Sequence, residues 1–326
     1  MKNNLWFGAI LCFVAAVSWG AMFPVAHAAF KHIDPFYFTI IRYGSVTILL
    51  VGILLWKEGK NAFRLEGKGK QLWFFGTMAF TVYNILIFWG QDMMGGPGVM
   101  VASVMEAMMP MISIVIVSLF YKRLPHTFTI ICVLISFIGA IFVITKGNIH
   151  AFLVASSDLF PSFLILIAVV GWVVYTMGGP QFAGWSALRY STLSCLFGTG
   201  TALIIVFLMT LFGRISIPTV DVLTLTAPHL LFMIIFPGII ALLGWNVGVN
   251  ILSPLNALLF INFVPITTLA ISIVQGNPLT TFDYLGTVLI IISLIANNIF
   301  LRFSEKKSLQ QKKETYGEKV VSQRFN

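Results

Sequence analysis

A single carboxylate, Glu106, stands inside the apolar stretch GPGVMVASVMEAMMPM. A charged side chain at the centre of a membrane helix costs roughly 2.5 to 3.5 kcal/mol on insertion scales, so it needs a partner or a function. On a continuous helix Ser103, Pro110 and Ser113 would share a face with it, and such a polar stripe should face a bundle interior or a wet cavity. We therefore predict that Glu106 binds a cationic group of a substrate, or a proton. The alternative is a structural carboxylate paired with Arg42 or with a neighbouring hydroxyl.

Two arginines, Arg42 and Arg189, lie in or near apolar stretches. A guanidinium grips a carboxylate through two parallel hydrogen bonds, so either arginine could hold the carboxylate of a substrate. Alternatively, a long basic side chain near a membrane boundary extends to the headgroup region. We favour that second interpretation for Arg189, which lies close to the start of its stretch, whereas for Arg42 both interpretations stay open.

Aromatic and amide side chains recur in the apolar stretches and could line a cavity. Such a lining suits a mostly apolar ligand with a polar end, although any single Trp can equally belong to the core or to the interfacial belt. Beside Glu106 and Arg42, the predicted substrate-binding residues are Trp19, Tyr83, Asn84, Gln91, Trp172, Trp245 and Asn246. Pro110 and Pro265 each remove a backbone hydrogen bond, so we expect a helix break at both, or else packing kinks without a ligand.

Several functional classes are not expected. The three cysteines and five histidines show no spacing typical of a metal site or a disulfide framework. No GxxxxGK[ST] phosphate-binding loop is present, so the chain is not expected to use ATP by itself. One lone membrane glutamate supplies no convergent acid and base, which argues against an enzyme, and the basic residues form no stripe for nucleic acid. We predict no catalytic residues, no metal and no cofactor.

The composition is that of a polytopic membrane protein. Of the 326 residues, 58% are hydrophobic and 10% are charged, against roughly 25% charged residues in an average soluble domain. A helix needs about 20 apolar residues to cross a bilayer core of about 30 Å, and helices are expected because a spanning segment must satisfy its own backbone. The predicted spans of this all-α membrane protein are ten, at 6–30, 36–56, 71–91, 98–120, 127–146, 159–178, 185–212, 229–247, 254–275 and 281–301.

The distribution of basic residues predicts the orientation, because cytoplasmic loops carry the excess of Lys and Arg. With both the N and C termini in the cytoplasm, about fifteen basic residues lie inside and about three outside. The inner set includes the loop KEGKNAFRLEGKGK and the polar tail 302–326. We expect this tail to be largely disordered or weakly helical and to contact anionic lipid headgroups.

The two halves of the chain resemble each other at an offset of about 150 residues. IIRYGSVTILL matches ALRYSTLSCLF, and MPMISIVIVSLFYKRLPHTF matches VPITTLAISIVQGNPLTTFD with Pro110 opposite Pro265. Trp19 likewise falls opposite Trp172, and Trp89 opposite Trp245. Each half holds five predicted helices, an odd number, so the halves cross the membrane in opposite senses. Inverted repeats of this kind enclose a site near the bilayer midplane in many secondary transporters.

The chain resembles the EamA branch of the drug/metabolite transporter superfamily. The resemblance is carried by AVSWGAMFPVA in the first helix, DPFYFTIIRY at the start of the second, the Pro-centred fourth and ninth helices and the duplicated five-helix unit. It divides the chain into EamA-like repeats at 6–146 and 159–301 followed by the cytoplasmic tail, and it implies transport of amino acids, metabolites or drugs, in several cases coupled to protons or exchange. YKRLP and GNPLT stand where family members commonly carry a GERLT-like motif, which removes an acidic residue from each helix end.

Together these features predict a multi-pass transporter of the plasma membrane that exports a small metabolite, such as an amino acid, by alternating access. One alternative is efflux of drugs or organic cations with Glu106 as the proton or cation site. Another is a receptor or scaffold that binds without translocating. The expected partners are a small-molecule substrate, membrane lipid and protons, with no nucleic acid, and the expected state is a monomer or homodimer. If the protein binds its substrate through a carboxylate, Arg42 should be essential, whereas cation export would make Glu106 essential.

Overall fold

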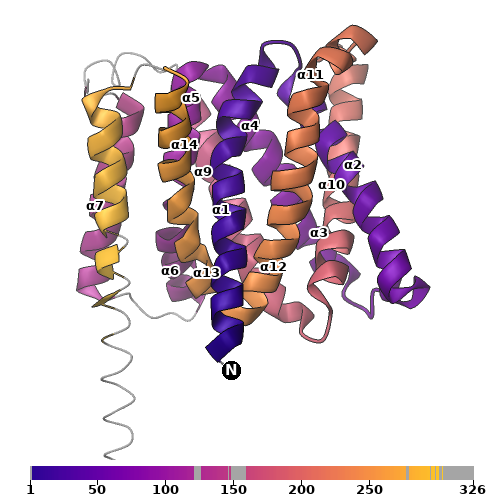
Figure 1. Ribbon diagram of the computed structural model, residues 1–326, viewed down its shortest axis with the longest axis horizontal. Coiled ribbons are helices and arrows are strands. Elements are labelled where there is room, and N and C mark those ends of the chain that lie inside the picture. The colour runs from indigo at the N-terminus through magenta and orange to yellow at the C-terminus, as the bar shows by residue number, and fades with distance from the viewer. Residues whose placement is uncertain are drawn as a thin grey trace, which may run out of the picture.

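The computed structural model describes residues 2–120, 126–145, 147, 159–276, 279–293, 295–297, 299–300 and 303. Every regular element within these residues is a helix, which confirms the predicted all-α class. The helices stand side by side in one bundle, with α1 near its middle and α7 and α2 toward opposite edges (Figure 1). Apart from Phe303, the predicted tail lies outside the described residues.

The first half of the chain contributes the elements from α1 to α7. Asp34 caps α2 by accepting a hydrogen bond from the Phe36 N–H at 2.8 Å, and Pro35 then starts the helix with its fixed φ. The elements are α1 (Lys2–Phe30), α2 (Pro35–Glu58), the 3-10 helix η1 (Lys60–Phe63), α3 (Gly69–Thr77), the π-helix η2 (Met78–Tyr83), α4 (Asn84–Met93), α5 (Gly96–Glu106), α6 (Met109–Phe120) and α7 (Thr127–Thr145).

The second half follows a similar order. Ser186 caps α10 by accepting a hydrogen bond from the Arg189 N–H at 2.9 Å. The elements are α9 (Leu159–Gly178), the 3-10 helix η3 (Gly179–Phe182), α10 (Ala187–Leu211), α11 (Val220–Met233), the π-helix η4 (Ile234–Ile240), α12 (Ala241–Leu252), α13 (Pro254–Leu258), the 3-10 helix η5 (Leu259–Asn262) and α14 (Phe263–Val274). A further apolar helix covers the described part of Thr281–Asn297.

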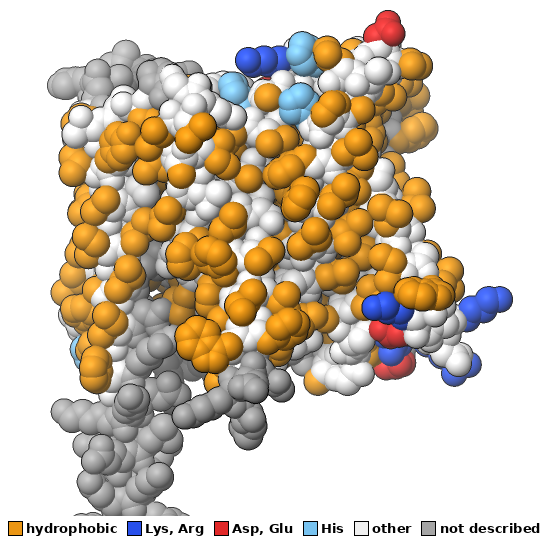
Figure 2. Space-filling model, viewed as in Figure 1, with side chains coloured by type: hydrophobic (Ala, Val, Ile, Leu, Met, Phe, Trp, Pro, Cys, Tyr) orange, Lys and Arg blue, Asp and Glu red, His pale blue; other side chains and the backbone are white. Residues whose placement is uncertain are grey.

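Within the described residues, seven helical runs are long and apolar enough to cross a membrane, and the bent pair of α5 and α6 makes an eighth if it crosses as one span. The seven are Leu5–Phe30, Pro35–Glu58, Gly69–Met93, Leu159–Phe182, Ala187–Leu211, Val220–Leu252 and Pro254–Val274. Two shorter apolar helices, Thr127–Val143 and Thr281–Asn297, fall where we predicted the fifth and tenth spans. Apolar side chains cover the middle of the visible face, and charged side chains gather at its two ends (Figure 2). The chain is a multi-pass membrane protein.

The fourth predicted span is broken rather than continuous. α5 ends at Glu106 and α6 begins at Met109, with a bend of 46° between them. Pro110 is the second residue of α6, where its missing N–H costs no intrahelical hydrogen bond. Pro110 therefore starts a second half-helix and does not kink a long one. In the repeat-related ninth span, the 3-10 helix η5 comes before α14, and Pro265 is the third residue of α14.

The break also separates the side chains of the expected polar stripe. Ser103 lies in α5 and Ser113 lies in α6, so the two do not share one helical face. Each hydroxyl donates a hydrogen bond within its own half-helix, Ser103 to the Met100 carbonyl at 2.9 Å and Ser113 to the Pro110 carbonyl at 2.6 Å. Glu106 is thus a helix-terminal carboxylate without a serine partner.

The two halves carry π-helices at matching places. η2 interrupts the third span at Met78–Tyr83, and η4 interrupts the eighth at Ile234–Ile240. In a π-turn the backbone N–H bonds to the carbonyl five residues before it instead of four, and such turns frequently occur at functional sites. In η2 the Asn84 amide donates to the Ala79 carbonyl at 2.7 Å, and in η4 the Trp19 indole N–H donates to the Pro237 carbonyl at 3.2 Å. Both donors are predicted substrate-binding residues.

Close backbone contact joins the halves where α3 meets α10. A Cβ added at Gly198 would lie 2.8 Å from the Cβ of Phe80 and closer still to the backbone of Gly76. The Thr81 hydroxyl donates to the Gly198 carbonyl at 2.7 Å across the same contact. Small residues and interhelical hydrogen bonds are the usual means of packing helices in a membrane. This contact therefore holds the third span of one half rigidly against the seventh span of the other.

Thr268→Val is expected to destabilise the fold through an unsatisfied backbone group. Pro24 has no N–H to offer the Gly20 carbonyl, and the buried Thr268 hydroxyl fills that role at 2.7 Å. A lost hydrogen bond of this kind costs about 1 kcal/mol, which lowers the unfolding temperature by about 2 to 4 °C. Thermal unfolding in detergent measures the change. Thr267→Val is the matched control, since the hydroxyl of this half-buried side chain bonds only its own helix, and equal shifts in both variants would contradict the assignment.

Candidate functional site

Four predicted aromatic residues from four different spans meet at the centre of the bundle. Trp19 lies with its ring centroid 5.1 Å from Trp172 and 5.1 Å from Trp245, and Tyr83 lies 5.0 Å from Trp172. We call these four rings the central aromatic cluster. None of them is more than 5% exposed. They bring together α1, η2, α9 and α12, so the repeat-related first and sixth spans touch here through Trp19 and Trp172.

Glu106 borders this cluster at the end of α5. Its Oε1 accepts a hydrogen bond from the Tyr83 hydroxyl. This is the contact expected if Glu106 were a structural carboxylate paired with a neighbouring hydroxyl. Its Oε2 is buried and has no hydrogen-bond partner among the described residues. The carboxylate also stands at a helix C-terminus, where the helix dipole disfavours negative charge. Half of this buried carboxylate is therefore without a partner within the described part of the chain.

Arg42, on α2, is the second buried charge near the site, and it is 1% exposed. Its guanidinium donates a weak hydrogen bond to the Asn84 Oδ1 at 3.4 Å and lies over the ring of Tyr43, 4.5 Å from its centroid. The Nε of Arg42 has no partner within the described part of the chain. The side chain stays inside the bundle and does not extend to the membrane boundary. It therefore retains hydrogen-bonding capacity that a carboxylate could use.

The two charges interact electrostatically without pairing directly. Arg42 acts on Glu106 through space, yet among the described residues no ion pair within 4.0 Å joins them. A buried charge without a close partner is costly, so buried charges in proteins are paired or hydrogen-bonded. The two groups have opposite charges, so Glu106 would attract an ammonium and Arg42 a carboxylate.

The other two predicted amides, Gln91 and Asn246, are buried and bond to neighbouring helices. Gln91 donates from Nε2 to the Phe23 carbonyl at 2.8 Å, and its Oε1 is buried without a partner in the described chain. Asn246 donates from Nδ2 to the Tyr175 hydroxyl at 2.9 Å and to the Ser191 hydroxyl at 2.7 Å. Tyr175 and Ser191 were absent from our prediction. The signal for Tyr175 was its position three residues after Trp172, which places both rings on one face of α9.

Two residues that the repeat pairs with site residues lie elsewhere. Trp89, opposite Trp245 in the repeat, is half-buried against Phe36 at 5.4 Å between centroids and does not reach the central cluster. Arg189, opposite Arg42, forms an ion pair with Glu66 at 2.7 Å at the end of the bundle. Hydrogen bonds from Trp185 and Arg189 lower the pKa of Glu66 below its ordinary value. Arg189 is therefore part of a surface network.

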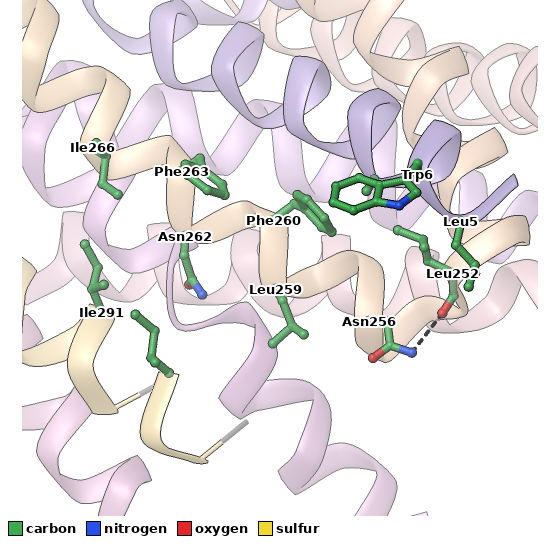
Figure 3. Close-up of a pocket in the computed structure, with 12 residues that line it drawn as sticks. Leu5, Trp6, Leu252, Asn256, Leu259, Phe260, Asn262, Phe263, Ile266 and Ile291 are labelled. Atoms are coloured by element: carbon green, nitrogen blue, oxygen red, sulfur yellow. Dashed lines mark hydrogen bonds between the residues drawn. The ribbon is translucent and has the colours of Figure 1, made fainter. Parts of the chain in front are cut away.

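Two hollows lie apart from the central cluster. The larger, of about 840 Å³, lies between the start of α1, the ninth span and the helix of 281–297, and rings of Trp6, Phe260 and Phe263 line it (Figure 3). It opens on the apolar outer surface and contains no predicted substrate-binding residue. The smaller, of about 520 Å³, lies between the α9–α10 connection and the α12–α13 connection.

Comparison with known proteins agrees with the duplicated architecture. The EamA-like transporter family matches residues 6–145 and again 159–299. The chain is 54% identical over 314 residues to the uncharacterized transporter YrdR of Bacillus subtilis (strain 168), covering 96% of this chain and 98% of that protein. It is 23% identical over 296 residues to the uncharacterized transporter YyaM of the same organism, covering 90% and 93%. One solved crystal structure shares the fold, with a TM-score of 0.65 at 14% identity over 91% of this chain and 98% of that one.

Proposed function

The chain belongs to the EamA-like transporter family, and on this premise we propose that it moves a small zwitterionic metabolite of the amino-acid class across the cell membrane. The observation that carries the proposal is the pair of opposite, buried and incompletely satisfied charges of Glu106 and Arg42 beside the central aromatic cluster. The ammonium of the substrate binds Glu106, its carboxylate binds Arg42, and its side chain packs on the aromatic rings.

The proposed mechanism is alternating access between two inverted five-helix repeats, 6–146 and 159–301. Ten spans with both termini in the cytoplasm place loop 59–68 inside and the α1–α2 connection outside. Broken helices of transporters commonly bind their substrates at their half-helix ends, and the α5–α6 break offers two such ends. The central rings are closed to solvent, so loading and release both require part of the bundle to move. Export is the direction we propose, with Glu106 also able to carry a proton.

A second candidate is efflux of lipophilic organic cations. The rings of Trp19, Trp172 and Tyr83 beside Glu106 favour it, because aromatic faces attract cations and a buried carboxylate neutralises them. This function would need Glu106 but would make no use of Arg42. Compounds that carry only one of the two charges therefore distinguish the candidates.

Counterflow into proteoliposomes tests the proposal with matched compounds. One set is leucine, 3-methylbutylamine and 4-methylpentanoate, and the other is phenylalanine, phenethylamine and 3-phenylpropanoate. We expect exchange of at least one amino acid, with exchange of its amine and its acid weaker by roughly tenfold or more, since each lacks one charge-assisted hydrogen bond. Transport of the amine alone would favour cation efflux. Binding without flux of any compound would make the protein a receptor.

A further inference from the structure

We infer that the hollow between the α9–α10 and α12–α13 connections is the vestibule through which the substrate reaches the central cluster, and that the stacked rings of Tyr175 and Tyr190 are the gate between them. The inference rests on the proposed function, because it assigns a path to the same transported molecule. It adds a second binding place and two gate residues to the site.

The vestibule has about 520 Å³ of space and walls of two kinds. Phe182, Trp185 and Tyr190 form an aromatic wall, and Asn250 and Ser253 add polar side chains to the lining. Such a lining can hold a small solute that has an apolar side chain and a hydrogen-bonding end. Its chemistry is therefore that of the central site without the buried charges, which suits a weak first binding place.

An unbroken series of rings leads from this vestibule to the central cluster. Tyr190 lines the vestibule and stacks on Tyr175, with centroids 5.2 Å apart and planes 10° apart. Tyr175 lies 5.3 Å from Trp172, which contacts Trp19 and Tyr83 of the central cluster. Tyr175 is completely buried, so the stacked pair separates the vestibule from the site.

The two gate tyrosines are held very differently. The Tyr175 hydroxyl is bonded by Asn246, a predicted substrate-binding residue, at 2.9 Å and by Ser194 at 3.3 Å. The Tyr190 hydroxyl makes one hydrogen bond among the described residues, to the Tyr175 carbonyl at 3.2 Å. Rotation of Tyr190 therefore breaks one hydrogen bond and its ring contacts with Tyr175 and Phe182, whereas rotation of Tyr175 would disrupt the site. Tyr190 is therefore the gate residue that moves.

The rest of the aromatic wall is anchored to the loop of the other repeat. The Trp185 indole N–H donates to Glu66 at 2.8 Å, and the Arg189 guanidinium lies over the Trp185 ring at 4.0 Å. The Lys68 ammonium donates to the Gln181 carbonyl at 2.8 Å. These contacts fix the vestibule wall to the loop that the proposed topology places in the cytoplasm. Tyr190 consequently moves while the rest of the vestibule wall stays in place.

Thiol accessibility tests the gate without knowledge of the substrate. In a protein whose Cys12, Cys132 and Cys195 are replaced by alanine, a single thiol is introduced by Asn250→Cys in the vestibule or by Ser194→Cys at a fully buried position that contacts Tyr175. A membrane-impermeant maleimide is then added from the side of loop 59–68. We expect rapid labelling of Asn250→Cys, and labelling of Ser194→Cys that is at least tenfold slower.

Adding Tyr190→Ala is expected to raise the labelling rate of Ser194→Cys at least tenfold and to leave that of Asn250→Cys unchanged. Tyr37→Ala is the control, since its hydroxyl bonds Thr210 away from the path, and it should change neither rate. If Tyr190→Ala does not fold, Tyr190→Phe, which keeps the ring and loses the hydrogen bond, should still accelerate labelling severalfold. Equal rates with and without the substitution, or an unreactive Asn250→Cys, would overturn the inference. Absence of counterflow alongside the expected labelling would refute the substrate class and leave the gate standing.

Discussion

Glu106→Gln is expected to weaken binding of the transported zwitterion at least roughly thirtyfold and to leave the fold intact. Losing one partner of a buried, hydrogen-bonded charge pair costs about 2 to 5 kcal/mol, and 1.4 kcal/mol is a factor of ten. Glutamine keeps the size of the side chain and can still accept the Tyr83 hydrogen bond. At the position of the unpartnered Oε2, an uncharged NH2 group that donates hydrogen bonds replaces a charged oxygen that accepts them. Titration calorimetry with the amino acid that exchanges best measures the effect.

Asp221→Asn provides the control for this substitution. Asp221 is an exposed carboxylate in the first turn of α11, so the same loss of charge there should leave the affinity unchanged. A Glu106→Gln protein that binds as tightly as the unaltered one would make Glu106 a structural residue, held by Tyr83 alone.

Arg42→Gln is expected to weaken binding of the same ligand by roughly ten- to a hundredfold, because hydrogen bonds to charged groups contribute about 1.5 to 3 kcal/mol. Arg42→Lys should fall between the two proteins, since lysine keeps the charge but loses the planar fork that binds both carboxylate oxygens. The loss should appear for ligands that carry a carboxylate and be absent for the matched amine. Calorimetric dissociation constants for the two ligands measure this difference.

Arg214→Gln is the matched control, because Arg214 is exposed in the connection between α10 and α11. If Arg42→Gln weakened binding of the amine and of the amino acid equally, Arg42 would act by holding Asn84 and the bundle. Binding of the substrate's carboxylate by Arg42 would then be excluded.

Much of the architecture could be predicted from the pattern of apolar stretches. A span must be about 20 apolar residues long, so helices such as Pro35–Glu58 and Ala187–Leu211 are visible as uninterrupted runs. The EamA-like resemblance was visible for a similar reason, since the duplicated unit leaves matching motifs in both halves. The number of spans is harder to fix, because the fifth and tenth correspond to short helices in the described chain.

The breaks within spans could not be placed from the same pattern. Hydropathy is continuous across Glu106 and Met109, and a proline marks a disturbance without telling whether it kinks a helix or starts a new one. The π-helices at Met78–Tyr83 and Ile234–Ile240 leave no sign in composition, since they depend on how the neighbouring helices fill the extra turn. These π-helices contain the Ala79 and Pro237 carbonyls that accept hydrogen bonds from Asn84 and Trp19.

The sequence showed only in part which side chains come together at the site. Repeat symmetry paired Trp89 with Trp245. Matching helices of the two halves nevertheless pack against different neighbours, and Trp89 contacts Phe36 instead of the central aromatic cluster. Tyr190 follows Arg189 in the repeat motif, yet nothing in the motif indicates that its ring stacks on Tyr175. Such contacts arise from the crossing of α9 and α10, which no local pattern encodes.

The central claim is that Glu106 and Arg42 hold opposite ends of one zwitterion, and crossed calorimetric titrations test it most directly. Dissociation constants are measured for the amino acid, its amine and its acid against the unaltered protein, Glu106→Gln and Arg42→Gln. The account predicts that removing the ligand's ammonium weakens binding to the unaltered protein but not further to Glu106→Gln, and that removing its carboxylate does the same for Arg42→Gln. Losses that simply add for every combination would show that neither residue touches the charge assigned to it.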